Sequence, residues 1–200
     1  MGRFKKSPKP LGQFQLVPGS VGRDNLTGYG GQAVFGGPGS DRLTGYSKMT
    51  ANGKWRIPSM LSGGAGDDQY IIKNGVFTII ADLGGGVDTV TTSLDLSRLR
   101  FSLVNQRDLL CSDGLTTVLI YDPLGAQDSK NAIEKVVASG SSYSTQDLYA
   151  MALNSSNFQG YTTYSDLESS GALNFTLTGL NPLLIDAYAS NGKYNNTLVL

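Results

Sequence analysis

The sequence predicts an all-β protein, with a short right-handed parallel β-roll of nonapeptide turns, then an antiparallel β cap and a β-rich C-terminal segment. Three observations lead to this fold class. Glycine is frequent, at 26 of 200 residues, without the every-third-residue period of collagen. Similar nine-residue motifs recur in the first half of the chain. Short runs that alternate apolar and polar residues, typical of strands, follow in the second half.

The recurring motif has the pattern G-G-x-G-x-D-x-U-x, in which U is a large apolar residue. Residues 36–44 (GGPGSDRLT) and 63–71 (GGAGDDQYI) match it at every specified position. Residues 19–27 (GSVGRDNLT) lack only the second glycine, and 84–90 (GGGVDTV) keep the G-x-G-x-D-x-U core. Glycines allow the first six residues to turn with positive φ, and the last three form a short strand whose U side chain points into the core. Two complete and two near matches predict a coil of stacked turns.

The sixth motif position places an aspartate in each of these four turns. Aspartate is a hard oxygen ligand on a short side chain, and 14 of the 16 acidic residues are aspartate. Turns that crowd carbonyl groups around such a carboxylate are suited to Ca²⁺, although aspartates that only cap turns are the alternative. The predicted calcium ligands lie at these twelve turn positions: Asp24, Asp41, Asp68, Asp88, Gly19, Gly22, Gly37, Gly39, Gly64, Gly66, Gly84 and Gly86.

Counting nine residues per turn predicts how the aspartates pair. On this count the first two motifs share one edge of the coil and the last two share the other. Asp24 and Asp41 would then flank one ion, and Asp68 and Asp88 another, with the last motif two residues out of register. Residues 46–60 lack turn aspartates, and we interpret them as an insertion; degenerate turns without ions are the alternative.

These motifs resemble those of the repeats-in-toxin family, the haemolysin-type calcium-binding proteins. The similarity includes a Y-I-I strand followed by G-x-D-T-V within 68–96, and strands like those of the family's trailing β unit within 107–148. It covers about residues 19–148, and Ala138-Ser139-Gly140 replaces the family's usual F-x-D-G pattern. The resemblance implies Ca²⁺ in the turns and type I secretion through an uncleaved C-terminal signal.

We predict four segments along the chain. They are a basic flexible arm at 1–18, a calcium-binding β-roll at 19–96 with the insertion near 46–60, a β cap at 97–148, and a C-terminal β segment at 149–200. The last segment is also the place for a secretion signal, and its alternating strands are the other interpretation. Either interpretation leaves the calcium sites within the second segment.

Several functional classes are excluded by residue content. The chain has no histidine, so it contains no Ser-His, Cys-His or HExxH centre. Cys111 is the only cysteine and cannot form an intrachain disulfide. The N-terminal segment, with four basic residues before the first acidic one, lacks the apolar run of a signal peptide. No run is long and apolar enough to span a membrane, and no basic-aromatic stripe suggests nucleic-acid binding.

The leading hypothesis is a secreted bacterial protein of the cell surface or extracellular matrix, non-enzymatic, whose β-roll is ordered by Ca²⁺. Because the formal net charge is zero, we expect two to four ions. The alternative is a self-assembling subunit of a surface layer, filament or virion, with a homo-oligomer as the functional form. A cell-surface glycan is a further candidate partner. A hydrolase or lyase is less favoured, since the remaining acidic residues show no catalytic spacing.

Overall fold

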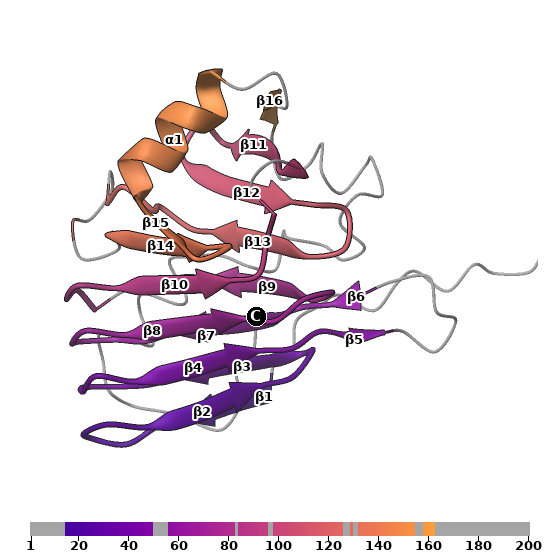
Figure 1. Ribbon diagram of the computed structural model, residues 1–200. Coiled ribbons are helices and arrows are strands. Elements are labelled where there is room, and N and C mark those ends of the chain that lie inside the picture. Colours follow the sequence, from indigo (N-terminus) through magenta and orange to yellow (C-terminus); the bar gives the residue numbers. More distant parts are fainter. Residues whose placement is uncertain are drawn as a thin grey trace, which may run out of the picture.

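The computed structural model describes residues 15–49, 56–82, 84–95, 98–125, 129, 132–154 and 158–162. Strands dominate this part of the chain, and a single α-helix accompanies them (Figure 1). The prediction of an all-β fold is therefore confirmed. Two sheets, called sheet A and sheet B below, stack face to face and run the length of the molecule.

Sheet A has eight strands, in the spatial order β1 (Gln15–Pro18), β3 (Gln32–Phe35), β7 (Ser59–Ser62), β9 (Phe77–Ile80), β13 (Thr117–Ile120), β12 (Asp108–Ser112), β11 (Arg100–Val104) and β16 (Phe158–Thr162). Sheet B has six, in the order β15 (Ser141–Ser144), β14 (Lys135–Ala138), β10 (Thr89–Thr92), β8 (Gln69–Ile72), β4 (Arg42–Gly45) and β2 (Asn25–Gly28). A separate antiparallel hairpin joins β5 (Lys48–Met49) to β6 (Arg56–Ile57).

From β1 to β10 the chain passes back and forth between the sheets, interrupted only by the β5–β6 hairpin. Neighbouring strands within each sheet are parallel along this stretch. Each strand has four residues, so it directs two side chains toward the other sheet and two outward. Glycine-rich turns therefore recur at one edge of the stack.

The main core lies between the two sheets. Its largest fully buried side chains include one apolar residue from the middle of each successive strand, such as Leu43 and Tyr70 of sheet B and Val34 and Leu61 of sheet A. Leu43, Tyr70 and Val90 occupy the U position of their motifs, as the sequence pattern predicts. Burial of these side chains drives the packing of one sheet on the other.

The region predicted as a cap extends both sheets. β11, β12 and β13 form an antiparallel meander, and its first turn places Asn105 and Gln106 at φ 51° and 59°. Two successive residues with positive φ are the signature of a two-residue hairpin turn. β13 then pairs in parallel with β9, and β14 with β10. The helix α1 (Thr145–Asn154) lies at this end of the stack (Figure 1).

Two predicted boundaries differ from the structure. The basic arm, predicted at 1–18, ends earlier, because residues 15–18 form β1 and Val17 packs against the core. The β segment predicted from residue 149 begins instead within α1, whose Leu148 is buried between the sheets. The rest of the arm (1–14) and the predicted secretion signal (163–200) lie outside the described residues. In the described part of the chain no helix is long and apolar enough to cross a membrane.

Candidate metal-binding site

The four predicted aspartates lie in a row along one edge of the molecule, which we call the turn edge. Each directly precedes a strand of sheet B, and these strands, β2, β4, β8 and β10, are neighbours in that order. The prediction that the turns divide between two edges is therefore wrong. The nine-residue count fails because one connection with the β5–β6 hairpin replaces two expected turns. The turns at 36 and 63 consequently stack directly, with Arg42 paired to Gln69.

Hydrogen bonds join the aspartates from turn to turn. The backbone N–H of Asp24 donates to Oδ1 of Asp41 at 2.7 Å, and that of Asp41 donates to Oδ1 of Asp68 at 2.7 Å. The N–H of Asp68 donates to Oδ1 of Asp88 at 2.8 Å. The N–H of Asp88 donates to Oε2 of Glu134 at 2.7 Å. One carboxylate oxygen of each acceptor residue therefore fixes the neighbouring turn.

The other oxygen is different. Oδ2 of Asp41, Asp68 and Asp88 is buried and has no hydrogen-bond partner, and these residues are 2%, 2% and 0% exposed. At the end of the row, Oδ2 of Asp24 accepts the N–H and the hydroxyl of Ser20 at 2.6 and 2.9 Å. Leaving a buried polar atom unsatisfied costs about 1–3 kcal/mol, and more when it is charged. Three such oxygens in one row therefore require protons or cations.

The same burial shifts the acidity of these groups. It raises the pKa of Asp41, and the charge of Asp24 adds to the effect. The pKa of Asp68 rises to about 7, chiefly through burial, with the charges of Asp88 and Asp41 contributing. The pKa of Asp88 rises to about 9, through burial and then through the adjacent Asp82 carboxyl group. Without a cation, Asp88 therefore keeps a proton at neutral pH.

Asp82 is a site residue that the sequence analysis missed. It follows β9 of sheet A, is fully buried, and accepts the N–H of Gly64 through Oδ1 at 3.2 Å. Its carboxyl group also interacts with Asp88 and with the hydroxyl of Tyr70. Two carboxyl groups in contact must share a proton or a cation, because two bare anions repel each other.

Tyr70 and Glu134 also belong to the turn edge, in roles that the motif does not reveal. The ring of Tyr70 fills the core at the U position, while its hydroxyl accepts the N–H of Gly63 at 2.7 Å. Glu134 ends the row of acidic residues one strand beyond the last motif. The only sequence signal for Asp82 is its position directly after the apolar run 76–81, and no repeat pattern marks Glu134.

The fourth turn is longer than the third. Leu61 pairs with Ile80 before the turns, whereas Gln69 pairs with Thr89 after them, so one residue is added. The offset is therefore one residue, not the two that the sequence analysis expects. Continuing from the Leu61–Ile80 pair places Asp82 beside Gly63, which is how a carboxylate enters this turn from the sheet A side.

Close stacking explains the glycines. A Cβ atom on Gly66, where φ is 124°, would lie 2.0 Å from the carbonyl oxygen of Gly39, and one on Gly39 would lie 2.1 Å from that of Gly22. Only glycine fits such an approach. The eight predicted glycines all belong to the stacked turns, so the structure brings them together with the four aspartates: Gly19, Gly22, Gly37, Gly39, Gly64, Gly66, Gly84 and Gly86.

Sheet A adds a second buried acidic group on the same edge. Asp122 follows β13 as Asp82 follows β9, and these strands pair in parallel register. Asp108 accepts Arg107 through both oxygens, at 2.6 and 2.8 Å, and Oδ1 also accepts the N–H of Asp122. The Arg107 guanidinium lies 4.3 Å from the ring centroid of Tyr121. Asp108 is thus neutralised by a cationic side chain, unlike the aspartates of the turns.

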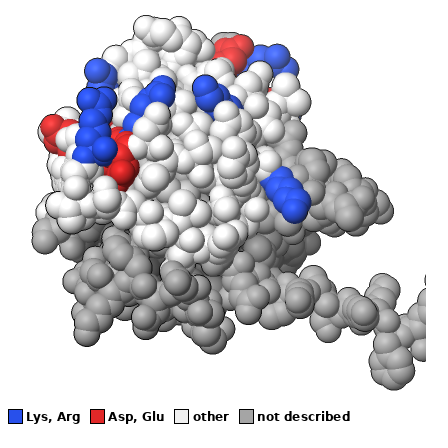
Figure 2. All heavy atoms as spheres, turned by 90° about the horizontal axis from the view of Figure 1, so that it is seen from below, with Lys and Arg blue, Asp and Glu red and all other residues white. Residues whose placement is uncertain are grey.

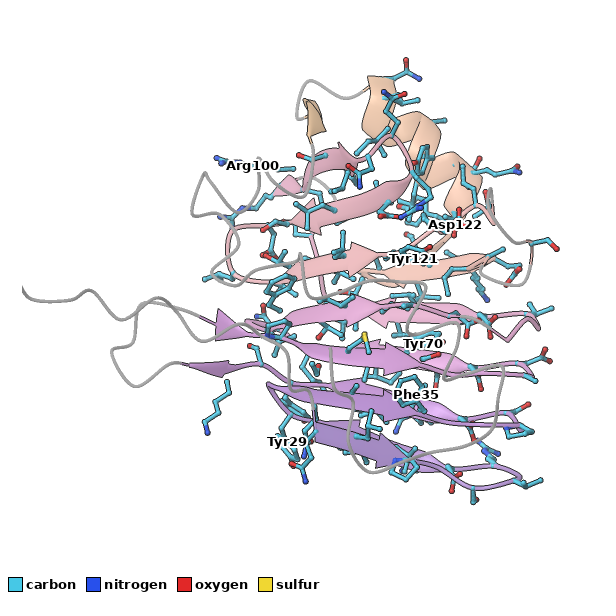
Figure 3. The ribbon with its side chains drawn as sticks, turned by 180° about the vertical axis from the view of Figure 1, so that it is seen from behind. Tyr29, Phe35, Tyr70, Arg100, Tyr121 and Asp122 are labelled. Atoms are coloured by element: carbon cyan, nitrogen blue, oxygen red, sulfur yellow. The ribbon has the colours of Figure 1, made fainter. Side chains whose placement is uncertain are left out.

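Figure 3 shows how the two edges differ. Asp122 lies toward the edge where the turns stack, whereas Tyr29 and Arg100 lie at the opposite edge. Within the described residues, no group of three or more His, Cys, Asp and Glu side chains could hold a metal ion by itself. A cation at the turn edge would therefore need backbone carbonyl oxygens in addition to carboxylates.

Comparison with known proteins gives no further guide to the site. No protein-family model matches the chain, and no curated protein matches it. The functional argument rests on the geometry of the turn edge.

Proposed function

We propose that the turn edge binds Ca²⁺ and that the protein is a non-enzymatic calcium-binding protein of the repeats-in-toxin type. The observation that carries this proposal is the row of buried Oδ2 atoms on Asp41, Asp68 and Asp88, none with a hydrogen-bond donor. Each lies in a turn whose glycines leave room for carbonyl groups of the adjacent turn. A divalent cation would neutralise these oxygens and stabilise the stacked turns together.

The chemistry of the donors favours calcium over other metals. Carboxylate and carbonyl oxygens are hard ligands, and calcium accepts six to eight of them in irregular geometry. Magnesium demands a compact octahedron, and zinc prefers nitrogen and sulfur. The chain has no histidine, and its one cysteine is buried in the core. Calcium is therefore the cation that suits the turn edge best.

Affinity then suggests where the protein works. Extracellular calcium modules bind at about 10⁻⁴–10⁻³ M. Sites with a few carboxylates and backbone oxygens fit this range, so the turns would gain their ions in a calcium-rich exterior. We therefore propose a secreted or cell-surface protein, exported from a bacterium by the type I route. In this proposal the carboxylates serve binding, which leaves a hydrolase or lyase as the weaker hypothesis.

The decisive experiment combines calorimetric calcium titration with circular dichroism on wild type and three single variants, Asp68→Asn, Asp88→Asn and Asp82→Asn. Asparagine keeps an oxygen that can accept the N–H of the adjacent turn while removing the charge. We expect each variant to lose at least one ion or to bind it about tenfold more weakly, as loss of a charged ligand predicts.

Asp147→Asn is the matched control. Asp147 is exposed, and its Oδ2 accepts the Ser144 hydroxyl at the start of α1, far along the chain from the turns. Its calcium titration should match that of wild type. A wild-type protein that shows no calcium heat and no change in thermal midpoint between chelator and millimolar calcium would overturn the proposal.

A second candidate, a self-assembling structural subunit, is favoured by the free end of the stack. β1 and β2 are the terminal strands of their sheets, and an unpaired strand edge can pair with another chain. Figure 2 shows that this end carries few charged side chains in its described part. Light scattering with and without calcium tests this candidate. Calcium-dependent oligomers that an Asn25→Pro substitution in β2 prevents would support it, and a strict monomer in both conditions would exclude it.

A further inference from the structure

Sheet A is apolar on both faces. Along its strands the side chains alternate, as strand geometry requires. Val34, Leu61 and Ile80 point between the sheets, and their neighbours form a second cluster on the outer face. We call this second cluster the outer patch, and it consists of Ala33, Phe35, Met60, Phe77, Ile79, Ala81, Val104, Leu119 and Tyr121, with Leu16 and Leu110 at its margin.

The outer patch is buried. Met60 is 1% exposed, Leu119 2%, Ile79 4% and Phe77 6%. Sheet B contrasts with it, because the outward residues that begin its strands, such as Arg42 and Gln69, are polar and exposed. An apolar patch that spans six strands is too large to be left in water on a soluble domain. Some part of the chain or a partner must therefore cover it.

The described elements do not account for this burial. Sheet B packs on the opposite face of sheet A, through the inter-sheet core. The helix α1 makes its main contacts with β15, β11 and β16, and its Leu148 faces the inter-sheet core. The cover must come from residues outside the described part of the chain or from another molecule.

We propose that residues 163–200 dock on the outer patch and form the missing third layer of the fold. The position of β16 supports this assignment. β16 is the edge strand of sheet A, pairs with β11, and ends at Thr162. The chain therefore leaves the described structure at the margin of the sheet whose outer face needs a cover.

The sequence of this segment suits the patch. Its 38 residues carry four charges and include three short apolar stretches, at 175–180, 183–185 and 198–200. Residues 1–14 are a poorer match, since they combine four basic side chains with two prolines. A basic, proline-containing segment would bring charge onto an apolar surface and could not add regular strands.

The length is also sufficient. Seven inter-strand spacings of about 4.8 Å make sheet A about 34 Å wide from β16 to β1. An extended chain of 38 residues reaches up to about 125 Å. The segment can therefore cross the whole patch and return, which a segment of a few residues could not do.

Photocrosslinking in the full-length chain tests this docking. A benzophenone amino acid replaces Phe77 in the outer patch, and a matched variant carries it at Gln69, which is exposed on the outer side of sheet B. After irradiation, peptide mass spectrometry identifies the partner of each label. We expect position 77 to crosslink predominantly to peptides from 163–200 of the same chain, and position 69 to give mainly quenched label.

Mixing isotopically light and heavy protein separates contacts within one chain from contacts between chains. Crosslinks from position 77 to residues 1–14, crosslinks between light and heavy chains, or predominantly quenched label would each overturn the proposal. If the bulky label at 77 prevents folding, photo-methionine at Met60 supplies the same measurement with almost no change in shape. Calcium binding is not required for any of these outcomes, so they are independent of the proposed function.

Discussion

Each aspartate in the middle of the turn edge divides its work between two oxygens. Oδ1 accepts a backbone N–H of the adjacent turn, and this bond positions the carboxyl group. Oδ2 of Asp68 and Asp88 has no donor and is closed off from water. Proton and cation therefore compete for the same atom, so that pH and calcium act on stability in opposite senses.

The first prediction concerns the calcium-free protein. The pKa values of about 7 for Asp68 and about 9 for Asp88 exceed the ordinary value of 3.8, so the folded chain holds protons that the unfolded chain has released. This contribution to stability is fully present below about pH 4 and is lost as the pH rises through these values. In chelator, we expect the thermal midpoint to fall steadily from about pH 5 to about pH 9.

Asp68→Asn provides the control, because asparagine is neutral in both states. We expect this variant to be more stable than wild type in chelator at alkaline pH, and to gain less from calcium. Asp147→Asn should keep the wild-type pH dependence. Differential scanning calorimetry in chelator measures all three proteins. A midpoint that rises with pH in wild type would contradict the assignment of buried, protonated aspartates.

The second prediction concerns Cys111. Burial raises the pKa of its thiol to about 12, and the side chain lies in the core between the sheets. The reactive species is the thiolate, which is scarce and inaccessible in the native protein. We expect no reaction with a chromogenic disulfide reagent at mildly alkaline pH until the chain is unfolded by denaturant, when one thiol per chain reacts. Rapid native-state reaction would show that this part of the core opens.

At the scale of the element, the stacked turn is held together by contacts that exclude a side chain. Gly66 and Gly114 both have positive φ, at 124° and 91°, but they differ in surroundings. A Cβ on Gly66 would meet the carbonyl of Gly39, whereas one on Gly114 would meet nothing within 4 Å. The pair therefore separates backbone strain from steric exclusion.

The third prediction follows from this pair. Gly114→Ala should cost about 1 kcal/mol of unfolding free energy, from backbone strain alone. Gly66→Ala should cost about 1–3 kcal/mol more, because the turns must move apart. Denaturant unfolding of both variants in chelator measures the difference. Equal losses would mean that the turns are not packed as closely as described.

Sequence patterns predicted the local features of these elements well. The turn glycines, the aspartate before each strand of sheet B and the inward residues Leu43 and Tyr70 all follow from a period that one repeat contains. The edge assignment failed because the β5–β6 hairpin changes how many crossings separate two motifs, and no residue in the motifs records that number. Asp82 was missed because it enters the site from the other sheet, across a distance in sequence that no repeat encodes.

At the scale of the whole molecule, the row of acidic residues runs across five strands of sheet B, from β2 to β14. Each turn contacts mainly the turns on either side, so stability in such a stack is approximately a sum of nearest-neighbour terms. An ion bound between two turns would strengthen one of these terms. The apolar outer patch adds a different kind of term, because it lies across many strands at once.

The fourth prediction uses this arrangement. One site at a calcium concentration a hundredfold above its dissociation constant adds about 2.7 kcal/mol to the free energy of unfolding. For a chain of this length, that gain corresponds to a rise of roughly 5–10 °C in thermal midpoint. We expect calcium to raise the midpoint by at least this amount, and chelator to reverse the rise.

Nearest-neighbour coupling also determines how substitutions combine. Asp41 and Asp88 lie two turns apart, with Asp68 between them, so Asp41→Asn and Asp88→Asn should reduce the calcium-induced stabilisation additively. Asp68→Asn and Asp88→Asn affect adjacent turns and should combine non-additively, because one ion between them is lost only once. Thermal unfolding of the four single and double variants, with and without calcium, measures both cycles. Additive effects in the adjacent pair together with coupling in the separated pair would show that the ions do not bind between neighbouring turns.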